Sequence, residues 1–378
     1  MKPLQQLLPR VRTQLITAFA AASLGLLLSS HAAAGNFYEQ RNLVSDGAVA
    51  ADHVDSNLVN AWGLAFNPTG PVWVSNNGTG TSTLYDGAGD IIPLVVTIPG
   101  PITSADPGKP TGIIFNGSSD FVITQGTKSG PGRFIFATEQ GTLAGWVPNI
   151  DMTHALTVID NSKQNAIYKG LALSAGGNGS LLYATDFHNG KIDVFDGKFA
   201  PVQIPGKFVD PYIPPGFGPF GIQAINGDIY VTYAKQGPDK VDDVHGKGLG
   251  VVDVFDPNGY LLRRIATGGP LNAPWGLALA PAGFGRFAGA LLIGNFGDGR
   301  ISAYDPVTGW YLGQLRTKNH RPLEIDGLWG LAFGNGFAGQ PVNTLYFTAG
   351  PAAEAHGLYG SVSAKASKDF SPFDGDDD

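Results

Sequence analysis

The stretch NAWGLAF, residues 60–66, decides the fold because its pattern recurs along the whole chain. Each copy is a short apolar segment around a central Gly, and the six copies are NAWGLAF from Asn60, KPTGIIF from Lys109, IYKGLAL from Ile167, GPFGIQA from Gly218, APWGLAL from Ala273 and GLWGLAF from Gly327. Successive central glycines are 49 to 58 residues apart, which fits one four-stranded blade per repeat. The spacing predicts an all-β fold, a six-bladed β-propeller.

Two further strands follow each inner one. The second strands are apolar runs that end in one polar or small residue: VWVSN at Asn76, FIFATE at Glu139, LLYATD at Asp186, IYVTY at Tyr233, LLIGN at Asn295 and LYFTA at Ala349. In the second repeat, VITQ ending at Gln125 competes with FIFATE for this position. The third strands run into hairpin turns, and we interpret their aspartates as turn formers: Asp86, Asp196, Asp256 and Asp305.

The last repeat has no convincing fourth strand, and the other end of the chain can supply it. FYEQRNLVSDG, residues 37–47, precedes the first repeat and has the pattern of a lone strand. Pairing it with the last blade would close the ring and remove two exposed sheet edges. We therefore predict one propeller domain over residues 35–368, followed by an acidic, disordered tail at 369–378.

The first 34 residues have the features of a secretory signal peptide. Lys2, Arg10 and Arg12 precede an apolar run from Leu15 to Leu28, and small residues lead up to a predicted cleavage after Ala34. The run is shorter than the roughly 20 residues that a membrane span needs. We expect an exported protein, periplasmic or extracellular, with no membrane span after cleavage.

Composition narrows the function classes. The chain has 54 Gly, 27 Pro and only 15% charged residues, which suits short strands and tight turns. Without cysteine, disulfides, thiolate metal ligands and a Cys nucleophile are excluded. Loss of the three basic residues of the signal leaves 21 basic against 31 acidic residues, a formal charge of −10, which argues against nucleic acid as a partner. We expect a monomer.

The repeats resemble those of a family of exported bacterial proteins related in pattern to NHL-type propellers. The resemblance rests on SNLVNAWGLAF (56–66), WVSNNGTGTSTLYDG (73–87), GNFGDGRISAYDP (294–306), DGLWGLAFGNG (326–336) and LYFTAGPAAEAHGLYGS (345–361). It covers nearly all of the mature chain and implies the propeller fold and export. Some members carry an exosortase-type sorting tail, and without its Pro-Glu-Pro signal we expect this chain to be released. The family has no established activity, so the resemblance leaves function open.

The repeats predict two rings of side chains at the face where inner strands begin and second strands end. The first ring, just before each central Gly, is Trp62, Thr111, Lys169, Phe220, Trp275 and Trp329. Its tryptophans are interpreted as wedges between blades, where the neighbouring Gly allows the backbones to approach closely. The alternative is an aromatic cup that binds a sugar or another flat ligand, and Tyr233 would then be part of that cup. Lys169 either reaches water at the rim or marks a site for an anion or carboxylate.

The second ring contains four oxygen-bearing side chains, Asn76, Glu139, Asp186 and Asn295. Hard cations prefer such ligands, so the set predicts a calcium site on the axis. The set is similar in composition, though not in motif, to the ring that holds calcium in six-bladed lactonases and related hydrolases. The alternative interpretation is a solvated polar funnel closed by hydrogen bonds.

Loops on the same face carry two histidines, His188 and His356, as candidate general bases or oxyanion donors for a calcium-assisted hydrolysis, against the simpler interpretation of solvated loop residues. The long charged insertion at 235–250 is expected to overhang the mouth, as a lid, a partner contact or a mobile loop. Phosphate-loop, zinc-protease, serine-elbow and EF-hand motifs are absent from the sequence.

Two functions follow from these patterns. The leading hypothesis is an exported binding or scaffold propeller whose channel mouth recognises a small molecule, a glycan or an envelope protein. The alternative is a calcium-dependent hydrolase or lyase acting on a small ester, lactone or sugar derivative. Whether the protein is an enzyme depends on the chemistry at the channel mouth.

Overall fold

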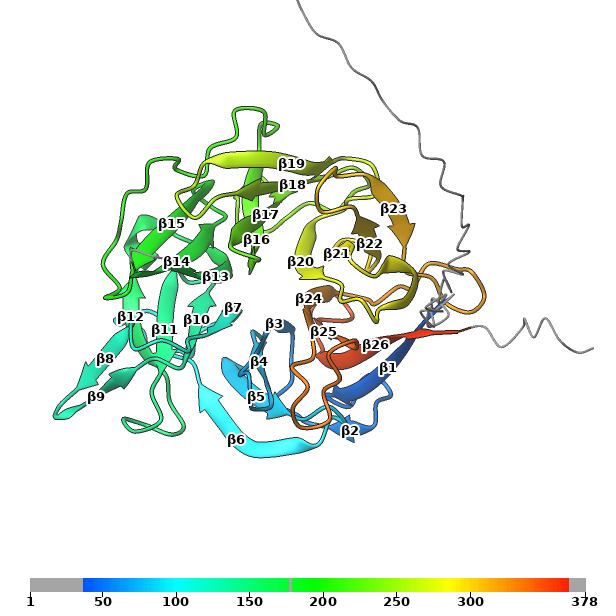
Figure 1. Ribbon diagram of the computed structural model, residues 1–378. Coiled ribbons are helices and arrows are strands. Elements are labelled where there is room, and N and C mark those ends of the chain that lie inside the picture. The colour runs from blue at the N-terminus through cyan, green and yellow to red at the C-terminus, as the bar shows by residue number, and fades with distance from the viewer. Residues whose placement is uncertain (1–36, 177–178, 367–378) are drawn as a thin grey trace, which may run out of the picture. The chain divides into compact units, whose positions relative to one another are not determined.

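The six Gly-centred segments form the six inner strands, as the sequence predicts. They are β3 (Ala61–Phe66), β7 (Pro110–Phe115), β13 (Tyr168–Gly176), β16 (Phe217–Ile225), β20 (Pro274–Leu279) and β24 (Leu328–Phe333). The computed structural model describes residues 37–176 and 179–366, so the predicted signal peptide and acidic tail lie outside the described residues. Figure 1 shows the inner strands arranged around the centre of the ring. The all-β six-bladed propeller is confirmed.

Each inner strand starts an antiparallel blade. Blade 1 continues with β4 (Val72–Asn76), β5 (Thr81–Tyr85) and β6 (Ile91–Thr97), and blade 2 with β10 (Phe134–Thr138), β11 (Thr142–Trp146) and β12 (Leu156–Asp160). Blade 3 continues with β14 (Gly179–Asp186) and β15 (Lys191–Asp196), and blade 4 with β17 (Asp228–Lys235), β18 (Gly250–Phe255) and β19 (Leu261–Thr267). Blade 5 continues with β21 (Leu291–Asn295), β22 (Ile301–Tyr304) and β23 (Tyr311–Gln314), and blade 6 with β25 (Leu345–Ala349) and β26 (Leu358–Lys365).

The central Gly of each inner strand allows neighbouring blades to make backbone contact. A Cβ on Gly63 would lie 2.5 Å from the carbonyl oxygen of Thr111 in the next blade, and one on Gly276 would lie 2.5 Å from that of Trp329. Both distances are too short for a real side chain. The interpretation of these glycines as points of close backbone approach is confirmed.

The N-terminal strand closes the ring. β1 (Phe37–Ser45) pairs antiparallel with β26, from Phe37 opposite Lys365 to Ser45 opposite Leu358, and β2 (His53–Val54) pairs parallel with β1. Sheet order is β2-β1-β26-β25-β24, so blade 6 is built from both ends of the described chain. The predicted closure is confirmed.

Two blades depart from the expected pattern. In blade 2, FIFAT forms the second strand, whereas VITQ forms β8 (Val122–Gln125), which pairs with β9 (Lys128–Pro131) in a separate hairpin that extends from the ring (Figure 1). Within residues 37–176 and 179–366, blade 3 has three strands where four were expected. Pro201 and Pro205 interrupt the segment where its fourth strand would run, since proline cannot donate to a sheet ladder.

The third-strand aspartates cap their turns as predicted. Asp86 Oδ1 accepts hydrogen bonds from the backbone N–H groups of Ala88 and Asp90, and Asp196, Asp256 and Asp305 make the equivalent bonds. These carboxylates therefore serve the hairpins and are not available for a site at the mouth.

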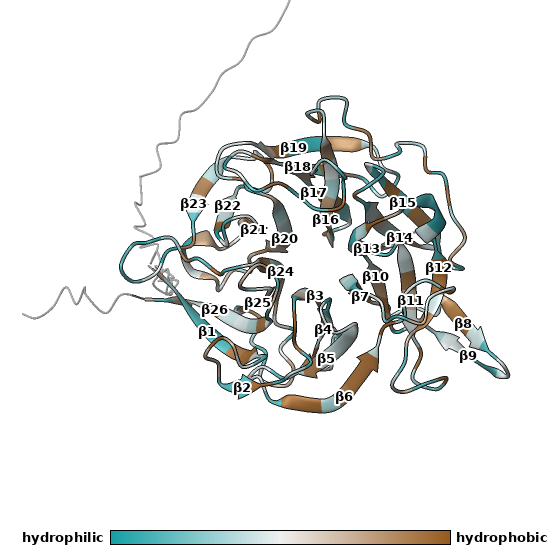
Figure 2. Cartoon of the chain, turned by 180° about the vertical axis from the view of Figure 1, so that it is seen from behind, coloured by the Kyte–Doolittle hydropathy of each residue, from teal (hydrophilic) through white to brown (hydrophobic). Residues whose placement is uncertain are grey.

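The outer rim carries exposed apolar side chains. β6 is strongly hydrophobic in Figure 2 and exposes Ile91 and Val95, and the turn between β22 and β23 exposes Trp310. Over residues 37–176 and 179–366, no helix combines the length and apolar character needed to cross a membrane.

Candidate functional site

Aromatic side chains close the central channel at the predicted mouth. All six residues of the first ring are buried, with at most 9% of any residue exposed. Four of them pack with two loop residues into one cluster, which we call the aromatic plug: Trp62, Phe187, Phe220, Trp275, Phe296 and Trp329. The tryptophans therefore pack on one another, and ligand access is restricted to whatever part of the plug faces a cavity. Their interpretation as wedges between blades stays a prediction.

Three rings of the plug form a stack. The Trp62 and Trp329 rings are stacked with centroids 3.6 Å apart, and Phe296 stacks on Trp329 at 3.8 Å. Trp275 meets both tryptophans edge-on, and its Nε1–H donates to the Lys169 carbonyl oxygen at 3.1 Å. The Lys169 Nζ lies 5.1 Å from the Trp62 centroid, so a cation lies near one end of the stack while Phe296 forms the other end.

Lys169 makes a buried ion pair at the mouth. Its Nζ lies 2.6 Å from Glu139 Oε1 and 3.3 Å from Asp242 Oδ1, and the Lys169 side chain is only 2% exposed. Glu139 Oε2 also accepts a hydrogen bond of 2.9 Å from Asn77 Nδ2. Lys169 therefore does not reach water at the rim but binds carboxylates that the chain itself supplies.

The ion pair fixes the charges of both partners. Burial alone would raise the pKa of Glu139, but the charge and hydrogen bond of Lys169 hold that pKa below its ordinary value. Burial alone would lower the pKa of Lys169, but Glu139 and Asp242 raise it. Both groups are therefore charged near neutral pH, and the mouth contains an internal cation.

The insertion at 235–250 lies over the mouth, as predicted, and we call it the mouth loop. Gln236 Nε2 donates to the Phe187 carbonyl oxygen at 2.5 Å, and Gly246 N–H donates to Asn272 Oδ1 at 2.7 Å. The His245 ring meets Phe296 edge-on with centroids 4.9 Å apart. The loop is thus tied to the plug at several points.

A left-handed turn brings Glu354 to the same mouth. Ala352, Ala353 and Glu354 have φ values of 56°, 54° and 67°, a conformation that side chains rarely adopt. Glu354 Oε2 accepts a hydrogen bond of 2.6 Å from Asn60 Nδ2. Burial raises the pKa of Glu354, and the charge of Glu139 raises it further. Glu354 is therefore a carboxyl group that gains a proton more readily than usual.

A cavity of about 410 Å³ opens beside the plug, and we call it the mouth cavity. It is lined by His245, Phe296, Gly297, Asp298, Gly299, Glu324, Asp326, Gly327, Gly350 and Ala353. Its volume falls within the range of small-molecule sites. Its lining includes Phe296 and three acidic residues, of which Glu324 pairs with Arg300 at 2.7 Å. The cavity combines an aromatic surface with hydrogen-bonding groups.

The four predicted metal ligands are held by local hydrogen bonds. Asp186 accepts from Ile167 N–H and from both the backbone and side chain of Asn189, and Glu139 pairs with Lys169. The amide of Asn76 donates to Thr81 and Thr83, and that of Asn295 donates to Pro270 and Asp298.

These contacts already occupy the two carboxylates that a calcium ion would need. The ammonium of Lys169 already neutralises Glu139. The Asp186 carboxylate already accepts hydrogen bonds from the backbone of Ile167 and the side chain of Asn189. In the described part of the chain, no group of three or more His, Cys, Asp or Glu side chains could hold a metal ion. Calcium stays a prediction, to be tested by melting the protein with millimolar calcium and with a chelator.

The other predicted residues lie apart from the mouth cavity. Tyr233 belongs to a buried hydrophobic cluster of residues from blades 3 and 4 instead of joining the plug. His188 Nδ1 is buried without a hydrogen-bond partner among the described residues. His356 Nδ1 lies 2.7 Å from Asp46 Oδ2, a contact that joins the loop before β26 to the residue after β1. Neither histidine lines the cavity.

The mouth loop contains a pH-dependent contact. His245 Nε2 lies 3.2 Å from Asp243 Oδ2, and the hydrogen bond to Asp243 raises the pKa of His245 against the opposing effect of burial. Because the pKa of His245 is higher in the folded protein than its ordinary value of 6.5, the protonated histidine stabilises the fold. This stabilisation is complete at pH values below 6.5 and is lost as the pH rises through the pKa of the folded state. Because His245 is half exposed, we expect about 0.2–1 kcal/mol.

Urea unfolding between pH 5 and 9 measures this effect. His245→Gln is expected to flatten the alkaline side of the stability profile, while His320→Asn, a change at an exposed histidine with a left-handed backbone, leaves it unchanged. Equal profiles for the natural protein and His245→Gln would show that the contact contributes nothing.

The sequence of this chain is similar to those of proteins from a virus. The chain is 34% identical over 327 residues to uncharacterized protein R648 of Acanthamoeba polyphaga mimivirus, covering 85% of this chain and 78% of that protein. It is 35% identical over 327 residues to uncharacterized protein L690 of the same virus, covering 85% and 84%. No family model matches the chain.

Solved structures share the fold at low sequence identity. A protein of unknown function from Bacteroides thetaiotaomicron superposes with a TM-score of 0.55 and 12% identity, covering 86% of this chain and 76% of that one. A glucose dehydrogenase gives 0.52 and 13%, covering 87% and 100%, and a protein assigned as a gluconolactonase gives 0.52 and 14%, covering 86% and 92%. These likenesses establish a propeller fold that proteins of different activities share.

Proposed function

The chain belongs to the same family as the mimivirus proteins R648 and L690, and because neither name records an activity, we propose a function from the site itself. The protein is an exported propeller that binds a small hydroxylated ligand at the channel mouth, such as a sugar unit of an extracellular or envelope glycan. The observation that carries this proposal is the mouth cavity, where an aromatic ring meets several carboxylates.

The lining of the cavity suits a sugar. Phe296 is held by its stack on Trp329 and by the edge-on contact of His245, and it is only 8% exposed. The small exposed part of its ring is the apolar surface that a sugar would contact. Asp298, Glu324 and Asp326 provide acceptors for hydroxyl groups, and His245 provides a ring nitrogen. An apolar surface with a few placed polar groups is the usual composition of a small-molecule site.

Sugar binding can be measured by thermal melting and NMR titration with glucose, galactose and N-acetylglucosamine. A ligand at about 100 times its dissociation constant adds roughly 2.7 kcal/mol of stability. We expect Phe296→Leu to weaken binding of the best sugar about tenfold, which is about 1.4 kcal/mol. Trp310→Leu, at an exposed aromatic residue on the rim, is the matched control and should bind normally. Failure of all three sugars to bind, or equal loss in the control, would refute the proposal.

A second candidate is hydrolysis of a small ester, lactone or sugar derivative, favoured by Glu354. A carboxyl group with a raised pKa is suited to general acid catalysis, and Glu354 follows directly after Ala353, which lines the mouth cavity. In that case Glu354→Gln would abolish turnover while leaving sugar binding in place. Binding without turnover of any tested ester or lactone supports the binding protein alone.

A further inference from the structure

Blade 3 leaves part of its outer edge without a strand partner. In the blades with a fourth strand, that strand covers the third one, but in blade 3 the chain after β15 only touches this edge. Phe195 forms an isolated antiparallel bridge with Pro201, and Val202 N–H donates to the Val194 carbonyl oxygen at 2.8 Å. The chain then turns away at Pro205, so the first half of β15 stays uncovered.

The uncovered half presents free backbone groups. Alternate residues of a strand direct their N–H and C=O groups to the same side. Because Val194 C=O points outward to Val202, the N–H and C=O of Ile192 also point outward. Neither Ile192 group forms a hydrogen bond across this outer edge with any residue in 37–176 or 179–366. An edge of this kind can accept an added strand.

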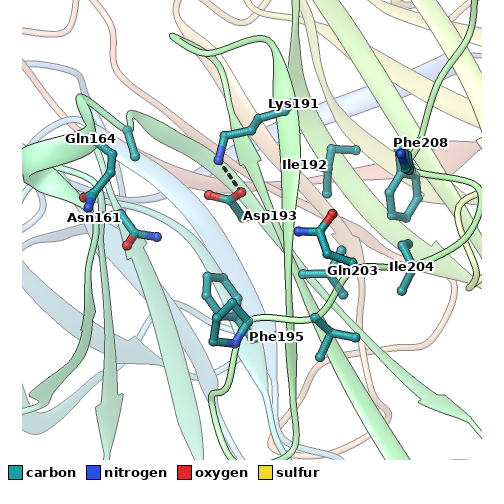
Figure 3. A pocket seen from close by; sticks show the side chains of 14 residues that line it. Asn161, Gln164, Lys191, Ile192, Asp193, Phe195, Gln203, Ile204 and Phe208 are labelled. Carbon is teal, nitrogen blue, oxygen red and sulfur yellow. Dashed lines mark hydrogen bonds and ion pairs between the residues drawn. The ribbon is translucent and has the colours of Figure 1, made fainter.

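A cavity of about 410 Å³ lies along this edge, and we call it the blade-3 groove. Figure 3 shows Lys191, Asp193, Asn161 and Gln164 together on one side of the groove, whereas Gln203 lies beside the apolar side chains of Ile192, Ile204 and Phe208. Lys191 Nζ lies 2.5 Å from Asp193 Oδ1, and Tyr168 donates to the other oxygen of Asp193 at 2.8 Å. Lys191 also lies 3.7 Å from Asp186, so nearby carboxylates already neutralise its charge. The exposed Lys207 forms no ion pair with any residue in 37–176 or 179–366, and it is the cation that the groove offers to a partner.

We propose that the C-terminal segment of a second copy, residues 367–378, adds to β15 as the missing fourth strand of blade 3. The segment, SKDFSPFDGDDD, has five Asp residues against one Lys, which complements the charge of Lys207. Its Phe370 and Phe373 match the apolar part of the groove. The segment follows β26 in blade 6, opposite blade 3 in the six-blade order (Figure 1), so a neighbouring copy supplies it.

The binding segment is short, and its attraction to the groove depends partly on charge. The association therefore depends on protein concentration and is weakened by salt. At low concentration the protein is therefore the expected monomer. Binding of the tail of one copy to the groove of the next copy is a head-to-tail contact. Such contacts produce open filaments unless the rotation between successive copies closes a ring.

The test titrates a labelled synthetic peptide of residues 366–378 into the full mature protein and follows fluorescence anisotropy. Saturable binding is expected, with about tenfold weaker binding for Lys207→Glu and for a peptide carrying Phe370→Ser and Phe373→Ser. Lys318→Glu, a change at an exposed lysine between blades 5 and 6, is the matched control and should bind as the natural protein does. Equal binding by both lysine variants, or no saturation, would overturn the proposal.

Amide hydrogen exchange separates strand addition from loose charge attraction. The peptide should slow exchange of the Ile192 N–H, while sedimentation of the full chain should show larger species as concentration rises. Binding without protection of Ile192, or sedimentation unchanged by concentration, would rule out strand exchange between copies. Because the groove and the mouth cavity are lined by different residues, sugar binding is unaffected by either outcome.

Discussion

Deletion of Phe37–Ser45 from the mature protein is expected to lower stability by more than the roughly 0.5–3 kcal/mol typical of single substitutions. The deletion removes the whole β1–β26 ladder and the buried side chains of Tyr38, Leu43 and Val44. Burial of each such side chain contributes about 1.5–3 kcal/mol. Tyr38 also stacks on Phe287 and donates to the Phe284 carbonyl oxygen at 3.1 Å, so blade 5 loses contacts too.

Thermal melts and solubility measure this loss. Shortening the β8–β9 hairpin by deleting Thr124–Ser129 is the control, because its paired residues are mostly exposed and the ring does not depend on them. A synthetic peptide of residues 37–45 added in trans should restore part of the lost stability. An unchanged melting temperature after the deletion would mean that the ring closes in another way.

The fold could be predicted because one physical requirement repeats six times. Each inner strand needs a Gly where it meets the next blade, as Gly63 and Gly276 show, and this leaves a recognisable spacing. The missing fourth strand of blade 3 was not anticipated. Pro201 and Pro205 were visible in the sequence, but proline is tolerated on edge strands, so their effect depended on the path of the whole segment.

The site was less predictable from the sequence. Alignment of the repeats shows where a residue lies along its strand, but it does not show which groups its side chain contacts. Asn76 and Asp186 occupy equivalent positions, yet each is held by its own turn. Phe296, His245 and Glu354 come from loops, outside the repeat pattern. The left-handed backbone that places Glu354 has no signal in an Ala-Ala-Glu sequence, since such residues rarely adopt it.

The ion pair at the mouth was missed for a related reason. Lys169 precedes an inner Gly and Glu139 ends a second strand of the neighbouring blade, so the sequence placed both at one face. Asp242 comes from the insertion, whose path no repeat specifies. The sequence therefore indicated a charged mouth but not that Lys169 would pair with Glu139, one of the predicted metal ligands.

Lys169→Met is expected to destabilise the protein by about 3–5 kcal/mol, the usual cost of removing one partner of a buried ion pair. Methionine fills the space of the lysine stem but leaves the Glu139 carboxylate without its cation. The pKa of Glu139 should then rise, because burial is no longer opposed by Lys169. The variant should therefore recover stability as pH falls and Glu139 gains a proton, opposite to the contribution of this group in the natural protein.

Two further variants separate charge from packing. Lys169→Met combined with Glu139→Gln removes both charges and should regain most of the lost stability, because no buried carboxylate is left unpaired. Lys198→Met, at an exposed lysine, should change stability by less than about 0.5 kcal/mol. Urea unfolding at several pH values measures all three. If the single and double variants lose the same stability with the same pH dependence, an unpaired Glu139 carboxylate does not destabilise the mouth, and the prediction is wrong.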